Sequence, residues 1–142
     1  MKRYQIPTLF LCIVSFAGYA QTENIEDISR ALAQQQLEAY NKRNIDEFLI
    51  PYSDSIKVYT YPNELRYQGK ETMRKRYAGF FERTPDLHCE VVSRTVYGNV
   101  VIDKEALTGI GKDKSKIREA LAIYTIEYGK ISEVRFVRKP KQ

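Results

Sequence analysis

LHCEVVSRTVYGNVVIDKEALT, residues 87–108, combines two strand patterns with a tight turn between them. Valine, isoleucine, threonine and tyrosine are frequent on both sides of the turn, and these residue types favour extended strands. Gly98 and Asn99 form a two-residue hairpin signal at the centre. The simplest register of such a hairpin places Tyr97 opposite Val100. We therefore expect two long antiparallel strands here.

This register predicts which side chains meet across the hairpin. The residue numbers of each opposite pair sum to about 197, which places Asp103 near Arg94 and Glu105 near Val92. His88 falls several residues further up its strand than the position opposite Asp103. A direct bond between His88 and Asp103 is therefore not implied by the spacing.

Two more strands are expected after the hairpin. Residues 117–128 and 131–137 are again rich in β-branched and aromatic residues. Polar, glycine-containing turns at residues 109–115 and 129–130 separate the strands. Four successive strands with turns between them predict an antiparallel meander.

The first half of the chain predicts helices. Asn24 is a good N-terminal cap for a helix that runs to about Tyr40. Asn44 begins a second, short helix, which Pro51 ends. The remaining elements before the hairpin are a strand over residues 55–61 and a third helix between Gly69 and Thr84.

This distribution of elements predicts the fold class. Helices gathered at one end of the chain and a meander at the other indicate an α+β fold, with three N-terminal helices packed on a mostly antiparallel sheet. The chain is 43% hydrophobic and 29% charged, which is the composition of an ordinary globular domain. We expect a single domain.

The start of the chain stands apart from this domain. Lys2 and Arg3 give a positive beginning, residues 9–16 are almost entirely apolar, and small residues follow up to Ala20. This pattern predicts a secretory signal over the first twenty residues and a mature domain over residues 21–142, exported to the periplasm or secreted. The apolar run is much shorter than the roughly 20 residues that cross a membrane, so we expect no stable membrane insertion after cleavage.

The mature part is mildly basic and has one cysteine. The first twenty residues hold two of the 23 basic residues and none of the 18 acidic ones, which leaves a net charge of +3. The basic residues are dispersed, so nucleic-acid binding is not expected. Cys89 is the sole mature cysteine, which excludes an intramolecular disulfide, and we expect it to be a buried strand residue.

Five segments together form a recognisable framework: LEAYNKRNIDEFLIPY (37–52), YQGKETMRKRY (67–77), PDLH (85–88), GNVVIDKEALTG (98–109) and residues 122–137. Their order resembles the SnoaL-like branch of the nuclear transport factor 2-like superfamily, over nearly all of residues 25–138. The resemblance implies a cone-shaped cup, in which the three helices pack on a strongly curved, mostly antiparallel sheet. Such cups occur in ketosteroid isomerases, polyketide cyclases, dehydratases and proteins with no assigned reaction, so the resemblance implies a fold rather than an activity.

The resemblance also implies a comparison with ketosteroid isomerase. That enzyme uses an aspartate base together with a tyrosine and a protonated aspartic acid. The corresponding positions here are Thr60, Gln36, and Ala122 or Ile123, none of which has a carboxylate. Steroid isomerisation is therefore not the expected activity. Gln36 lies within the apolar stripe of its helix, where it is either a core amide bonded to backbone or a polar group of the pocket.

His88 and Asp103 are the candidate catalytic residues. His88 is the only histidine of the chain, and imidazole is the usual proton-transfer group near neutral pH. Asp103 shares a strand face with Glu105, a face that meets either water or the mouth of a cavity. The alternatives are a structural or surface histidine and a surface ion pair of Asp103 with Arg94.

Further residues are expected to line the pocket because they fall on elements that form the cup in similar proteins. Tyrosine is suited to such a wall, since it offers a flat apolar ring with a hydroxyl group. Arg135 is a weaker candidate of the same kind. The expected pocket residues are Gln36, Tyr59, Tyr61, Tyr77, Glu105, Glu119 and Tyr124.

Several chemistries are not expected. One histidine beside one cysteine does not make a zinc site, because neighbours on a strand point to opposite faces. The sequence has no phosphate-binding loop, dinucleotide fingerprint or nucleophile-elbow motif. We therefore expect no metal and no cofactor.

Three functions stay open at this point. The favoured one is an exported protein that binds a small apolar or amphipathic molecule in the cup. The first alternative is an isomerase, cyclase or dehydratase that uses His88 and Asp103 for proton transfer. The second is a non-catalytic module that forms a homodimer through its sheet.

Overall fold

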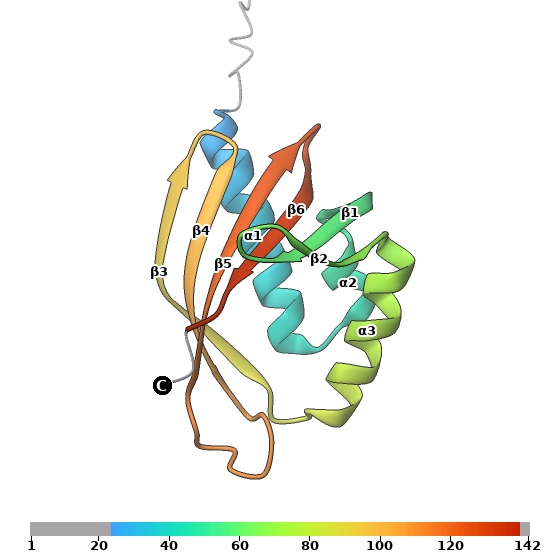
Figure 1. Ribbon diagram of the computed structural model, residues 1–142, viewed down its shortest axis with the longest axis vertical. Coiled ribbons are helices and arrows are strands. Elements are labelled where there is room, and N and C mark those ends of the chain that lie inside the picture. Colours follow the sequence, from blue (N-terminus) through green and yellow to red (C-terminus); the bar gives the residue numbers. More distant parts are fainter. Residues whose placement is uncertain (1–23, 140–142) are drawn as a thin grey trace, which may run out of the picture.

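The computed structural model describes residues 24–139, so the signal sequence predicted at residues 1–20 lies outside the described residues. Within the described range the chain forms three helices and six strands (Figure 1). No helix in this range is both long and apolar enough to cross a membrane. The elements are α1 (Ile25–Lys42), α2 (Ile45–Leu49), β1 (Tyr52–Thr60), β2 (Glu64–Gln68), α3 (Lys70–Arg83), β3 (His88–Tyr97), β4 (Val100–Thr108), β5 (Arg118–Glu127) and β6 (Lys130–Val137).

The first two helices begin at the asparagines expected from the sequence. The side chain of Asn24 accepts a hydrogen bond from the backbone N–H of Glu26, at 3.1 Å. Asn44 accepts from the backbone N–H groups of Asp46 and Glu47, both at 3.2 Å. These bonds satisfy N–H groups that have no partner within the first turn of a helix.

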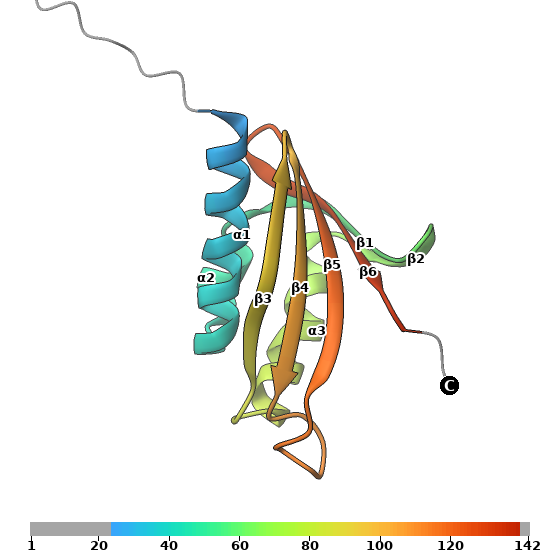
Figure 2. The ribbon, with the colours of Figure 1, turned by 90° about the vertical axis from the view of Figure 1, so that its left-hand side faces the viewer.

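The six strands form one curved sheet in the order β2-β1-β6-β5-β4-β3. Only the contact of β1 with β6 is parallel, so the predicted mostly antiparallel sheet is confirmed. The helix α1 packs on β3 and β4, and α3 packs on β1 and β2. Figure 2 shows α1 running alongside the long strands β3 and β4. The helices thus cover one face of the sheet, which becomes the inside of the cup.

The strand β2 was not expected from the sequence. It has five residues, and only Tyr67 among them is buried. Polar residues alternate along it, which is the pattern of an edge strand with little core contact. Its pairing with β1 nevertheless brings Tyr67 opposite Val58 and adds a wall to the cup.

A β-bulge changes the predicted register of the hairpin. Tyr97 lies opposite Val100 and Arg94 opposite Asp103, as predicted. The pairing then shifts between Val91 and Ser93, which makes Val92 an extra residue. Beyond this point Glu105 lies opposite Val91, so the expected pairing of Glu105 with Val92 is wrong.

The last turn also differs by one residue from its expected position. Glu127 lies opposite Lys130, so the two turn residues are Tyr128 and Gly129 rather than Gly129 and Lys130. Both have positive φ angles, of 51° and 70°. This conformation suits the two-residue turns that match the twist of antiparallel strands.

Phe48 of α2 is the centre of an aromatic cluster that joins the three helices to the sheet. Its ring centroid lies 4.5 Å from that of Tyr77, 5.6 Å from Phe81, 6.0 Å from Tyr40 and 5.2 Å from Tyr52. Tilted and edge-on contacts of this kind are the preferred geometries of aromatic pairs. The cluster fixes Tyr40, Tyr52 and Tyr77 at the inner end of the cup.

Candidate functional site

Two cavities lie next to each other inside the cup. The outer cavity has a volume of about 390 Å³ and the inner one about 90 Å³. Five residues line both of them, so the two cavities adjoin and share a wall. The shared residues are Tyr40, Tyr77, Leu107, Ala120 and Phe136.

The strand β4 supplies the polar groups that face this interior. Asp103 and Glu105 are buried, whereas Ile102 and Lys104 between them are exposed. Successive side chains of a strand point to opposite faces, so the two carboxyl groups share the inner face. Glu105 lines the inner cavity and is 6% exposed.

A chain of hydrogen bonds connects Glu105 to three other elements. The Tyr124 hydroxyl of β5 donates to Oε1 of Glu105, at 3.0 Å. Gln36 of α1 donates from Nε2 to the Tyr124 hydroxyl oxygen and to the backbone carbonyl of Ala33, both at 3.2 Å. The Tyr52 hydroxyl of β1 donates to Oε1 of Gln36, at 3.3 Å. The chain orients four polar side chains beside the inner cavity.

The protonation of Glu105 is set by its surroundings. Burial raises its pKa to about 7, and the negative charge of Asp103 acts in the same direction. The hydrogen bond from Tyr124 and the positive charge of Arg94 oppose this rise. At neutral pH the carboxyl group is therefore divided between its acid and its base form, which is the condition for both giving and taking a proton.

The neighbouring hydroxyl and thiol groups stay protonated at neutral pH. Burial raises the pKa of Tyr52 and Tyr124 well above its usual value, and the charge of Glu105 adds to the effect. Burial likewise raises the pKa of the Cys89 thiol, which lines the inner cavity. The tyrosines are thus hydrogen-bond donors, and Cys89 is a buried thiol rather than a reactive thiolate.

Arg94 and Asp103 form an ion pair at the inner face of the hairpin. The Nε and Nη2 atoms of Arg94 donate to the two carboxylate oxygens of Asp103, each at 2.7 Å. The expected pairing of Asp103 with Arg94 is confirmed. Asp103 has no exposed surface, so the expectation that this pair lies at the surface is wrong. Nη1 of Arg94 also donates to Oε1 of Gln34, at 3.0 Å. All three donor atoms of the guanidinium group therefore have partners.

The family model of the SnoaL-like domain matches residues 33–134. The chain belongs to the SnoaL-like domain family. The resemblance inferred from the sequence is thereby confirmed. Among the curated proteins, none matches this chain.

Solved structures have the same fold as this SnoaL-like domain. An uncharacterised cystatin-fold protein from Novosphingobium aromaticivorans is 26% identical with a TM-score of 0.71, and the match covers 78% of this chain and 97% of that one. A protein of Kribbella flavida assigned as a ketosteroid isomerase is 18% identical with a TM-score of 0.64, covering 84% and 86%. An LEH-like epoxide hydrolase of M. tuberculosis is 12% identical with a TM-score of 0.66, covering 82% and 81%.

His88 and Asp103 are not brought together in this SnoaL-like domain. His88 is exposed and lies opposite Thr108, at the end of β3. Its neighbour Cys89 is buried and faces the inner cavity, so His88 points to the other face of the sheet. Proton transfer by His88 and Asp103 therefore stays a prediction, and the geometry favours Glu105 instead.

Most of the expected pocket residues line a cavity. Gln36, Tyr77, Glu105 and Tyr124 line the inner one, and Tyr77 also lines the outer one together with Glu119. Two others line neither: Tyr59 lies under the guanidinium group of Arg135, 4.7 Å from its ring centroid, and Tyr61 is 56% exposed.

Other cavity residues were missed by the sequence analysis. Tyr40 and Tyr52 line the inner cavity, and four arginines line the outer one: Arg66, Arg76, Arg118 and Arg138. Arg66 belongs to the unexpected strand β2, and Arg76 lies in a run of basic residues on α3. Within residues 24–139, no three histidine, cysteine, aspartate or glutamate side chains converge to hold a metal ion.

Proposed function

We propose that this SnoaL-like domain binds a small amphipathic molecule in the two adjoining cavities. The observation that carries the proposal is the shared wall, because it places the outer cavity directly beside the inner one, which Glu105 lines. The outer volume of about 390 Å³ lies within the roughly 300–1,000 Å³ of small-molecule sites. The walls are mainly aromatic and aliphatic, with polar side chains in both cavities, which suits a molecule that has an apolar body and a polar group.

A blocking variant tests this proposal. Ala120 lies on the shared wall, so Ala120→Phe fills the junction between the cavities. A library of apolar and amphipathic molecules is screened by thermal shift, since a ligand that binds the folded state raises the melting temperature. We expect some of these molecules to raise the melting temperature of the wild type and to leave that of Ala120→Phe unchanged.

Ala31→Phe is the matched control, because Ala31 is exposed on α1 and lines neither cavity. This variant adds the same side chain at a distance from the site. Every molecule that stabilises the wild type should stabilise it as well. A screen without a stabilising ligand, or ligands that bind equally well to Ala120→Phe, would count against the proposal.

Proton-transfer catalysis is a second candidate, favoured by the position and the pKa of Glu105. The carboxylate form would take a proton from a carbon next to a carbonyl group of the bound molecule. The hydroxyl group of Tyr40, which lines both cavities, would stabilise the negative charge that develops on the carbonyl oxygen. Glu105, now protonated, would return its proton to another carbon, which completes an isomerisation with no net change of atoms or electrons.

Deuterium exchange tests this chemistry without knowledge of the natural substrate. Aryl ketones that stabilise the protein in the thermal screen are incubated in D2O, and exchange at the carbon next to the carbonyl group is followed by NMR. We expect catalysed exchange with the wild type and none with Glu105→Gln. His88→Ala should catalyse exchange at the wild-type rate. Loss of exchange in His88→Ala would instead support His88 as the proton-transfer residue.

Export and dimer formation, the two other parts of the expected function, are tested separately. Export through residues 1–20 is checked by fractionation of cells that express the full chain. A homodimer through the sheet is checked by light scattering at micromolar concentration, where a strict monomer would exclude it.

A further inference from the structure

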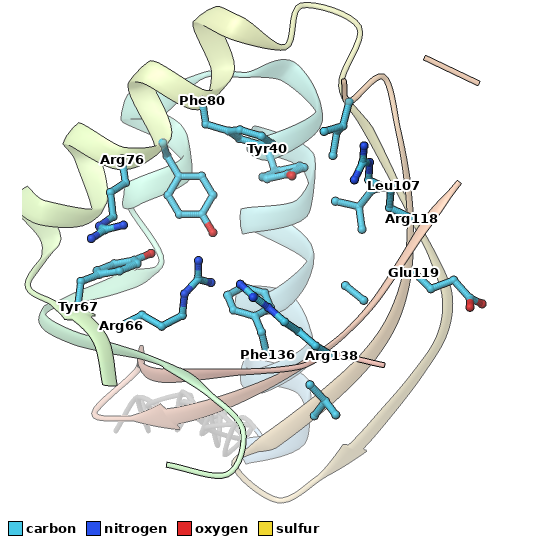
Figure 3. A pocket seen from close by; sticks show the side chains of 14 residues that line it. Tyr40, Arg66, Tyr67, Arg76, Phe80, Leu107, Arg118, Glu119, Phe136 and Arg138 are labelled. Atoms are coloured by element: carbon cyan, nitrogen blue, oxygen red, sulfur yellow. The ribbon is translucent and has the colours of Figure 1, made fainter. Parts of the chain in front are cut away.

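The outer cavity is lined by four arginines that come from different parts of the fold. Arg66 lies on β2, Arg76 on α3, Arg118 at the start of β5 and Arg138 directly after β6. Figure 3 shows the side chains of Arg66 and Arg138 reaching toward the interior of this cavity, with Phe136 between them in that view. Four positive charges thus converge on one space.

Acidic side chains do not neutralise this group. Within residues 24–139, no ion pair involves Arg66, Arg76, Arg118 or Arg138. Among the described residues, Glu119 is the one carboxylate that lines the outer cavity, and it is already paired with Lys104 and Lys139. The outer cavity therefore has an excess of positive charge, although the protein as a whole carries a formal net charge of only +5.

Aromatic rings hold two of these arginines in place. The guanidinium carbon of Arg76 lies 4.7 Å from the ring centroid of Tyr67, and that of Arg66 lies 5.9 Å from the centroid of Phe136. Cation–π contact of this kind orients the planar group and leaves its N–H edge free to donate. A guanidinium group held in this way is suited to a carboxylate, which it binds through two parallel hydrogen bonds.

We infer that the ligand is an amphipathic monocarboxylate whose carboxylate lies among the arginines of the outer cavity. The inference rests on the proposed function and deepens it. The apolar body of the ligand lies along Phe80, Leu107 and Phe136 and points to the inner cavity. The opposite orientation is unfavourable, because it would bring the carboxylate against Glu105 in a site removed from water.

Two probes of equal chain length test the inference. Decanoate and decan-1-ol differ in the charge of one end, and near pH 8 decanoate is ionised. Their dissociation constants are measured by calorimetry below the concentration at which decanoate forms micelles. We expect decanoate to bind about tenfold more tightly than decan-1-ol, with an affinity that falls as sodium chloride is added.

In the double variant Arg66→Gln/Arg138→Gln, the affinity for decanoate should fall by about tenfold. The affinity for decan-1-ol should stay within about twofold of the wild-type value. Arg30→Gln/Lys112→Gln is its control, because it removes the same charge from exposed residues that line neither cavity. Equal binding of the two probes, or an equal loss of decanoate in the control, would overturn the inference and leave the binding cavity standing. A wild-type chain that binds neither probe would overturn the proposed function as well.

Discussion

Arg94 holds Asp103 through two hydrogen bonds of 2.7 Å between adjacent strands, and the Asp103 side chain is completely removed from water. The guanidinium group lies at the inner face of the hairpin and also supplies a positive charge near Glu105. The pair therefore links the stability of the hairpin to the electrostatics of the cavity.

Asp103→Ala is expected to destabilise the protein by about 3–5 kcal/mol, because it leaves the mostly buried Arg94 without its counter-charge. Denaturant unfolding followed by circular dichroism measures the change. Asp54→Ala is the control: this carboxylate pairs with Lys70 but is 97% exposed, so its loss should not be measurable. Equal effects of the two substitutions would show that burial does not matter here.

Glu105 makes the stability of the fold depend on pH. Its pKa is raised from 4.5 to about 7, so between these values the folded state keeps a proton that the unfolded state has released. The contribution of Glu105 to the free energy of unfolding should therefore be largest below about pH 4.5. It should fall by roughly 3 kcal/mol as the pH rises through 7.

Glu105→Gln removes this dependence while keeping a side chain that can accept from Tyr124. The free energy of unfolding of this variant is measured by urea unfolding at a series of pH values. It should no longer decrease between about pH 4.5 and 7. At pH 8 the variant should be more stable than the wild type. A variant that keeps the same slope would mean that Glu105 titrates normally.

Cys89 should react slowly with alkylating reagents in the folded protein. It is 3% exposed, and burial raises the pKa of its thiol, so both access and the thiolate fraction are low. Iodoacetamide labelling near pH 8 is followed by peptide mass spectrometry, which separates Cys89 from Cys12. We expect labelling at Cys89 to become rapid only in denaturant. Rapid labelling of the native protein would contradict the burial of this thiol.

Two glycines allow a matched comparison of backbone effects. Gly109 and Gly129 both have positive φ angles, of 77° and 70°, but a Cβ at Gly109 would overlap the backbone carbonyl of Asp86, whereas one at Gly129 meets open space. Gly129→Ala should cost about 1 kcal/mol of stability from the φ angle alone. Gly109→Ala should cost clearly more, by about 2 kcal/mol or above, as measured by thermal and urea unfolding. Equal losses would mean that the loop after β4 moves freely away from Asp86.

Much of the fold could be predicted because its signals are local. Asn24 and Asn44 mark helix starts, and the Gly98-Asn99 turn fixes the pairing of Arg94 with Asp103. The strand β2 gives a much weaker signal, because its alternation of polar and apolar residues extends over only five residues and one of them is buried.

The site was only partly predictable, because several of its properties depend on residues that are distant in the sequence. Gln36 stood out as a polar residue in an apolar helical stripe, and it does lie beside the inner cavity. Glu105 was recognised as a cavity candidate, but its raised pKa depends on burial by elements distant in the sequence. The arginines of the outer cavity come from four separate segments, and no local pattern relates them.

The extra residue at Val92 determines which side chains the inner cavity contains. In a regular strand, the residues that share a face with Arg94 would be Val92, Glu90 and His88. The bulge shifts this order by one position, so Val91 and Cys89 share the inner face instead, and Cys89 lines the inner cavity. The bulge in this ten-residue strand therefore selects a thiol for the cavity wall, whereas the same strand without the bulge would turn Glu90 and His88 to that face.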